Sequence, residues 1–164
     1  MRIALYPCCG TDFEIPSTLL SSYADTVIFC DTNKRNRKEF KDWYAARSSA
    51  PLIQTKFECV DVWDLLKTCS KLSVFFYRGD SSGEGGSGIP VFSNEFLEVL
   101  MAKFEDTGYI LSDGSNSVGG MFQAMKRRSG VDRFGFRFRP VAEQPMLENH
   151  GLFLIKVEKL LPSR

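Results

Sequence analysis

Residues 3–31 read IALYPCCGTDFEIPSTLLSSYADTVIFCD, and this run indicates the architecture of the rest of the chain. Its first apolar stretch, Ile3–Tyr6, is typical of a buried strand. Apolar residues at helical spacing follow around Pro16, and proline suits the first turn of a helix. A second apolar stretch, Val27–Cys30, ends at Asp31. Strand, helix and strand in succession predict an α/β arrangement.

The same alternation continues toward the C-terminus, which predicts an α/β fold with one domain over residues 1–164. Helices are predicted over residues 94–106 and near residues 118–126, and two earlier ones are predicted to begin at a capping residue, one at Asn33 or Thr32 and one at Asp61. Further strands are predicted at Leu52–Val60, Leu72–Tyr77, Tyr109–Ser112, Arg133–Arg139 and Leu152–Val157.

Two local patterns refine this scheme. Gly108 is expected to end the helix over residues 94–106, because glycine readily takes the left-handed conformation that follows a helix. Phenylalanine and arginine alternate through Arg133–Arg139. That alternation is typical of a half-exposed strand near the edge of a sheet.

The charge of the chain is nearly balanced. Its 164 residues include 21 Lys and Arg against 20 Asp and Glu, a formal net charge of +1. This balance argues against binding nucleic acid or an anionic membrane through the overall field. Basic residues nevertheless gather in residues 33–47 and 126–139, on either side of an acidic middle. Those that would contact a phosphate backbone are Lys34, Arg35, Arg37, Lys126, Arg127 and Arg128.

The cysteines indicate the compartment. The chain has five cysteines, an odd number, and no two of them form a C-x-x-C pair. They are Cys8, Cys9, Cys30, Cys59 and Cys69. That usage is typical of free thiols in a reducing compartment, and it predicts no metal site. No apolar stretch has the length of a signal peptide core or a membrane helix. We therefore expect a cytoplasmic protein without a membrane partner.

Residues that directly follow the predicted strands are the candidates for a ligand site. In an open parallel sheet, ligands bind outside the carboxyl ends of the strands. The first such loop lacks G-x-G-x-x-G, and G-x-x-x-x-G-K-[ST] occurs nowhere, which argues against dinucleotide oxidoreductases and P-loop NTPases. Acidic residues in the first loop favour an uncharged or cationic ligand over a phosphate.

These positions resemble those of class I S-adenosylmethionine-dependent methyltransferases, over nearly the whole chain. Cys9-Gly10-Thr11 is similar to the centre of that family's loop at the amino-acid part of the cofactor. Asp31 matches the acid that binds the ribose hydroxyls, and Asp61-Val62 matches the adenine-side pair. The resemblance implies S-adenosylmethionine as cofactor. It also implies a three-layer, Rossmann-like fold whose mostly parallel seven-stranded sheet has the order 3-2-1-4-5-7-6 and an antiparallel last strand.

The first loop departs from the family pattern. Tyr6 stands where the family has an acid, and Cys8 and Asp12 replace glycines. After the fourth strand, Tyr77-Arg78-Gly79-Asp80 replaces the Asn/Asp-Pro-Pro-aromatic motif, which argues against amino-group methylation of that type. The expected cofactor contacts are Tyr6, Cys9, Gly10, Thr11, Asp12, Asp31, Asp61 and Val62, and the expected acceptor-side residues are Arg78, Asp80 and Asp113.

Two functional hypotheses follow. The first is a small methyltransferase whose acceptor the sequence does not name, with a homodimer or a partner protein completing the acceptor pocket. The alternative is a catalytically silent Rossmann-like module that binds nucleic acid or a protein. The Gly/Ser-rich loop 79–88 is either a lid over the crevice or a plain connection.

Overall fold

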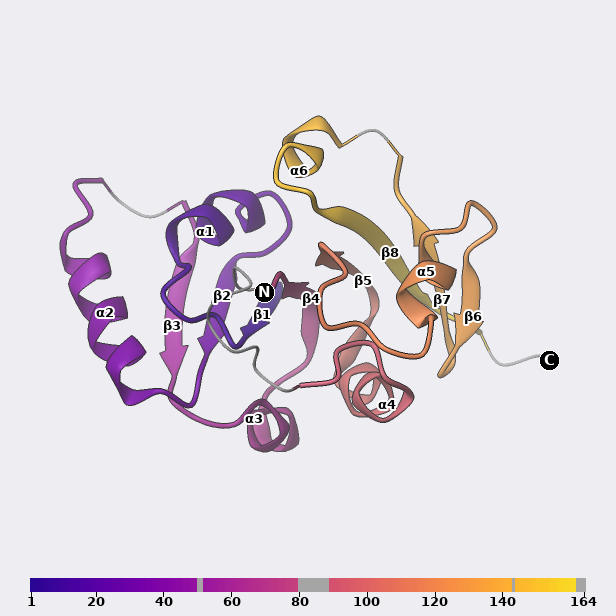
Figure 1. Cartoon of the computed structure of the whole chain (residues 1–164), viewed down its shortest axis with the longest axis horizontal. Coiled ribbons are helices and arrows are strands. Elements are labelled where there is room, and N and C mark those ends of the chain that lie inside the picture. Colours follow the sequence, from indigo (N-terminus) through magenta and orange to yellow (C-terminus); the bar gives the residue numbers. More distant parts are fainter. Residues whose placement is uncertain (50–51, 80–88, 143, 162–164) are drawn as a thin grey trace. The chain divides into compact units, whose positions relative to one another are not determined.

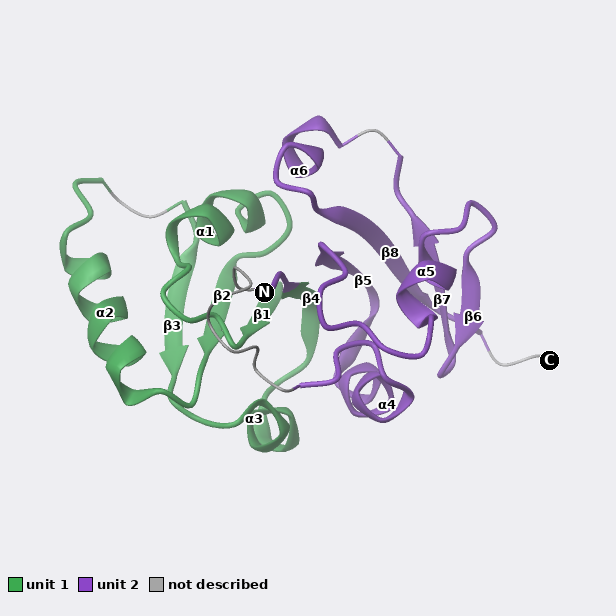
Figure 2. Ribbon diagram, viewed as in Figure 1, with its two compact units in different colours: residues 1–76 green, residues 77–164 purple. Residues whose placement is uncertain are grey.

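The computed structural model describes residues 1–49, 52–79, 89–142 and 144–161. The chain divides into two compact units, residues 1–76 and 77–164 (Figure 2). The predicted single domain over residues 1–164 stays a prediction.

Unit 1 alternates strands and helices in the predicted order (Figure 1). β1 pairs in parallel with both β2 and β4, and β2 pairs in parallel with β3. In Figure 1, α1 and α3 lie on opposite sides of these strands. The elements are β1 (Ile3–Pro7), α1 (Glu14–Leu20), β2 (Thr26–Cys30), α2 (Lys34–Ala45), β3 (Gln54–Glu58), α3 (Val62–Thr68) and β4 (Leu72–Tyr77).

Side chains at predicted positions start two of these helices. The Asn33 side chain accepts a hydrogen bond from the backbone N–H of Arg35 at the start of α2. Asp61 accepts from the N–H of Trp63 at the start of α3. Such caps satisfy N–H groups that have no partner inside the helix.

An aromatic cluster packs α2 onto the sheet of unit 1. Phe40 of α2 lies 5.3 Å from Phe13, 5.9 Å from Phe29 and 5.5 Å from Phe57, measured between ring centroids. Trp43, one turn later, lies 5.4 Å from Phe13. These contacts hold the C-terminal half of α2 close to the start of α1, where a pocket lies.

Unit 2 pairs its strands antiparallel. β5 pairs with β8, β8 with β7, and β7 with β6. Its core includes buried side chains of the helices and of β8. The elements are α4 (Asn94–Ala102), β5 (Phe104–Ser112), α5 (Met121–Met125), β6 (Val131–Arg133), β7 (Phe136–Pro140), α6 (Pro145–Glu148) and β8 (Phe153–Lys159).

The strands follow the order β3-β2-β1-β4-β5-β8-β7-β6 in one sheet. This order confirms the predicted α/β, Rossmann-like class, including the antiparallel strand near the C-terminus. The predicted order 3-2-1-4-5-7-6 reappears once β7 and β8 are matched to the last two predicted strands. The described residues hold eight strands rather than seven, because β6 adds a short strand beside β7.

The helix predicted over residues 94–106 is shorter than expected. It ends at Ala102, and β5 already begins at Phe104. Gly108 lies inside β5 and pairs with Val157, so its predicted role as the helix stop is wrong. Pairing with β8 satisfies backbone groups along this part of β5, which favours strand over helix here.

The single strand predicted at Arg133–Arg139 is a hairpin. β6 ends at Arg133, which pairs with Phe136 of β7. The two residues between them, Phe134 and Gly135, have φ values of 53° and 76°. Positive φ at both central residues is the geometry of a type I′ hairpin turn. Phe134 therefore lies in the turn, and the prediction of one continuous strand over Arg133–Arg139, with its phenylalanines on one face, is wrong.

Candidate functional site

The first loop leaves β1 through two left-handed residues. Cys8 has φ +54°, and Gly10 has φ +54°. Cys9 between them is 0% exposed, and the N–H of Asp12 donates to its carbonyl oxygen at 2.9 Å. The buried Cys9 anchors the loop, whereas Thr11 is exposed. The loop thus presents its backbone at Gly10 rather than the Cys9 side chain.

The loop is tied to the end of β2 by a backbone-to-carboxylate hydrogen bond. The N–H of Gly10 donates to Oδ2 of Asp31 at 3.0 Å. The other carboxylate oxygen of Asp31 accepts from the N–H of Asn33 at 2.8 Å. Asp31 is half-buried. Its two oxygens are therefore fixed in place, and each retains a lone pair for a further donor.

Two expected site residues bind each other. The buried hydroxyl of Tyr6 donates to Oδ2 of Asp12 at 3.0 Å. The Tyr6 ring is held in turn by Phe76, edge-on at 4.7 Å between centroids, and by Phe29 at 6.1 Å. Tyr6 therefore positions the half-buried carboxylate of Asp12 from inside the core.

Asp61 and Val62 lie at the start of α3 but differ in exposure. Asp61 is exposed, and its Oδ1 accepts from the N–H of Trp63 at 2.8 Å. Val62 is 2% exposed and belongs to the core of unit 1. Of this pair, only Asp61 offers a polar group to the surroundings.

Two buried cysteines near the first loop, Cys9 and Cys30, have raised thiol pKa values. Burial raises the pKa of Cys9 well above its ordinary range, and the nearby Asp31 carboxylate raises it further. Burial, followed by the neighbouring Cys8 and Asp31, raises the pKa of Cys30 to about 12. A protonated thiol is a poor nucleophile and a poor metal ligand. Among the described residues, no group of three or more His, Cys, Asp or Glu side chains could hold a metal ion.

The three acceptor-side candidates all belong to unit 2. The half-buried Asp113 carboxylate accepts from the N–H of Gly79 at 3.1 Å and from the N–H of Ser115 at 2.9 Å. The Ser115 hydroxyl also donates to it. Asp113 thus organises the turn after β5. Arg78, directly after β4, is half-buried, and Asp80 lies outside the described residues, as do residues 81–88 of the Gly/Ser-rich loop.

The predicted basic residues are divided between the two units. Lys34, Arg35 and Arg37 are exposed on the first turns of α2, where Arg35 lies 3.9 Å from Glu39. In unit 2, the ammonium group of Lys126 lies 4.0 Å from the Phe153 ring centroid and 5.4 Å from that of Phe122. Arg127 and Arg128 follow it and are exposed.

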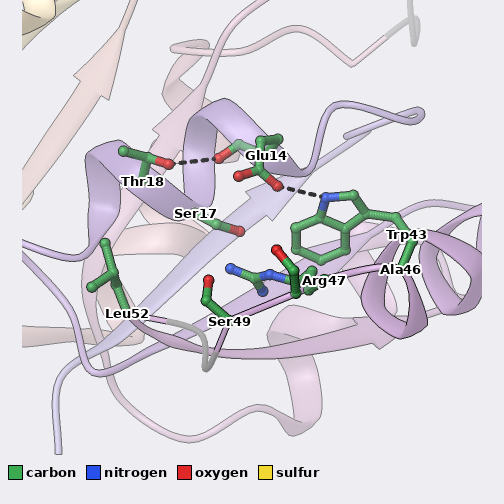
Figure 3. Close-up of a pocket in the computed structure, with 9 residues that line it drawn as sticks. Glu14, Ser17, Thr18, Trp43, Ala46, Arg47, Ser49 and Leu52 are labelled. Atoms are coloured by element: carbon green, nitrogen blue, oxygen red, sulfur yellow. Dashed lines mark hydrogen bonds between the residues drawn. The ribbon is translucent and has the colours of Figure 1, made fainter.

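One polar pocket in unit 1 was not predicted. It lies between α1 and the residues around the C-terminal end of α2, and its volume is about 330 Å³ (Figure 3). The sequence offers one indication of this pocket, the spacing of four residues between Trp43 and Arg47. That spacing is about one helical turn, and the Arg47 guanidinium lies over the Trp43 ring. Its lining residues are Glu14, Ser17, Thr18, Trp43, Ala46, Arg47, Ser48, Ser49 and Leu52.

Comparisons with known proteins reach only the level of the fold. No family model matches the chain, and no curated protein matches it. A candidate methyltransferase from Streptococcus mutans, in complex with SAH, has a TM-score of 0.60 at 14% identity, covering 98% of this chain and 89% of that chain. An rRNA methylase from Streptococcus thermophilus has a TM-score of 0.56 at 13% identity, with coverages of 98% and 87%. A methyltransferase from Geobacter sulfurreducens has a TM-score of 0.54 at 12% identity, with coverages of 98% and 71%.

These likenesses confirm the predicted resemblance at the level of architecture. The chain has the Rossmann-like fold seen in class I S-adenosylmethionine-dependent methyltransferases. Among the helices that the structure describes, none combines the length and the apolar character needed to cross a membrane.

Proposed function

We propose that the protein binds S-adenosylmethionine in unit 1 and transfers its methyl group to an acceptor. The hydrogen bond between Gly10 and Asp31 is the observation that carries this proposal, because it joins the first loop to the end of β2. Ligands of doubly wound α/β folds bind at this edge of the strands. When bound, S-adenosylmethionine supplies a methyl group activated by a sulfonium.

The residues present fit such a cofactor. Each oxygen of Asp31 already accepts one backbone N–H and can accept one more donor, as a ribose diol requires. Gly10 has no side chain, so a ligand can approach the loop backbone closely. Asp61 keeps its Oδ2 available beside the exposed start of α3.

Asp12 compensates for the acid that Tyr6 replaces. In this proposal the Tyr6 hydroxyl holds the Asp12 carboxylate close to the first loop, so a negative charge is kept there. A carboxylate at this place suits the cationic sulfonium and ammonium groups of the cofactor. Cys9 and Val62 are buried and would support the site by packing, while Thr11 is exposed and free of that constraint.

The proposal assigns Arg78, Asp80 and Asp113 to the side of the methyl acceptor, because they follow β4 and β5. Methyl transfer to a positioned nucleophile depends mainly on orientation and on the exclusion of water. Nucleic acid as a partner, a homodimer and a cytoplasmic location stay predictions from the sequence, and the proposal requires none of them.

Titration calorimetry with SAH tests the cofactor site. We expect saturable binding to the wild-type protein and at least about tenfold weaker binding to Asp31→Ala, because hydrogen bonds to a charged group contribute about 1.5–3 kcal/mol. Asp64→Asn is the matched control, since Asp64 is exposed on α3 and pairs with Lys67. No heat with the wild-type protein would overturn the proposal and favour the silent binding module.

A further inference from the structure

The pocket between α1 and the end of α2 contains none of the residues expected to bind the cofactor. Its volume of about 330 Å³ is at the lower end of the range of ligand pockets. A ligand that fills it is therefore small. Figure 3 shows the Ser17 hydroxyl and the Arg47 guanidinium directed into the pocket from the two segments.

Two buried polar atoms of this pocket have no hydrogen-bond partner. They are Oγ of Ser17 and Nη1 of Arg47. Ser17 as a whole is only 2% exposed. Burying a polar group without a partner destabilises a protein, and such groups are rare in native structures. Two of them in one cavity indicate that a ligand supplies the missing acceptor.

The pocket is lined by one base and one acid that do not pair. The guanidinium of Arg47 lies 4.5 Å from the Trp43 ring centroid, and within the described ranges no carboxylate comes within 4.0 Å of it. On α1, Oε2 of Glu14 accepts from the indole N–H of Trp43 at 2.8 Å. Within the described residues, its Oε1 accepts no hydrogen bond from the protein and is available to a ligand.

We propose that this pocket binds a small zwitterion of the α-amino-acid class. The ligand carboxylate accepts from Nη1 of Arg47 and from the Ser17 hydroxyl, and the ligand ammonium donates to Oε1 of Glu14. A phosphate dianion would be repelled by Glu14, and a simple cation would be repelled by Arg47. The opposite charges of the two walls thus select a ligand that carries both.

Calorimetry on the whole protein tests this assignment with L-alanine, L-leucine, acetate, methylamine and inorganic phosphate as probes. We expect saturable binding of at least one of the amino acids, and at least about tenfold weaker binding of acetate and methylamine, because each of these loses at least one charged hydrogen bond. Failure of both amino acids to bind, or binding of phosphate alone, would overturn the proposal.

Three variants locate the binding in the pocket. Arg47→Met, Glu14→Gln and Ser17→Ala should each weaken amino-acid binding, the first two by about tenfold or more. Glutamine still accepts from the Trp43 indole, and alanine removes a hydroxyl that has no partner, so the Glu14 and Ser17 variants keep the fold even if the Arg47 variant does not. Lys38→Met on the exposed face of α2 is the control.

The same protein samples test whether this pocket is separate from the proposed cofactor site. SAH should bind equally well to the wild-type protein and to Glu14→Gln, and excess SAH should not displace the bound amino acid. Displacement would show that the pocket is part of the cofactor site and would overturn the proposal. Loss of SAH binding with retained amino-acid binding would overturn only the methyltransferase proposal.

Discussion

At the scale of single residues, the hydrogen bond from Tyr6 to Asp12 gives the first prediction. Tyr6→Phe removes the hydroxyl and keeps the ring between Phe29 and Phe76. We expect the free energy of unfolding to fall by about 1.5–3 kcal/mol, the usual net contribution of a hydrogen bond to a charged group. Urea denaturation measures it, and Tyr44→Phe, on the exposed end of α2, is the control. An unchanged midpoint would show that the bond contributes nothing.

Ser17 gives the second prediction, an increase in the free energy of unfolding. Its buried hydroxyl has no partner in the described structure. Ser17→Ala removes that unsatisfied group and adds a better helix former inside α1, so we expect a gain of about 1 kcal/mol in unfolding free energy. The same denaturation experiment measures it, with the exposed Ser22→Ala as reference. A loss of stability would mean that the hydroxyl already has a partner in solution.

Tyr6 and Ser17 differ from the other candidate site residues in how well the sequence predicts their contacts. Gly10, Asp31 and Asp61 were predicted because each follows a strand, and position along the chain suffices for that. The bond between Tyr6 and Asp12 depends on how the loop folds back over β1, which no spacing rule gives. The pocket of Ser17 and Arg47 arises where two helices approach, so its residues carry no motif.

At the scale of elements, two glycines that flank β6 form a matched pair, Gly130 directly before the strand and Gly135 in the turn after it. Gly135 has φ +76° and Gly130 has φ +68°. An added Cβ would meet nothing within 4 Å at Gly135, whereas at Gly130 it would overlap the carbonyl oxygen of Phe138. We expect Gly135→Ala to cost about 1–2 kcal/mol through its left-handed backbone alone, and Gly130→Ala to cost more. Denaturation of both variants measures this, and equal losses would contradict it.

This hairpin explains which elements the sequence predicts poorly. Alternating phenylalanine and arginine has the period of a strand on both sides of the turn, and Phe134 interrupts neither the period nor the polarity. The signal was Gly135, which allows the second left-handed position. The start of β5 was missed for a related reason. Phe104 fits both a helical and a strand pattern, and pairing with distant β8 decides between them.

At the scale of the whole molecule, the alternation of apolar stretches predicted the class, and the resemblance to a family supplied the strand order. Length and composition do not contain that order, because it depends on which strands pair across long separations. The eighth strand was missed because β6 spans only Val131–Arg133. Three residues are too few for a periodic signal.

The stability of the folded protein should depend on alkaline pH through its buried thiols. Burial raises the pKa of Cys30 to about 12 and raises that of Cys9 further, whereas an unfolded cysteine ionises near 9.0. Above that pH the unfolded chain releases protons that the folded chain keeps, so ionisation favours unfolding. The stabilising contribution is therefore complete below about pH 9 and is lost as the pH rises toward about 12.

Replacing one buried thiol should reduce this loss. Each thiol adds a slope of about 1.4 kcal/mol per pH unit between the two pKa values. Urea denaturation at a series of alkaline pH values should therefore show a shallower decline for Cys30→Ala than for the wild-type protein. Cys59→Ala, at a half-buried cysteine, is the control for the loss of a thiol as such. Parallel declines for Cys30→Ala and the wild-type protein would mean that Cys30 ionises equally easily in both states, and therefore that the end of β2 is open to water.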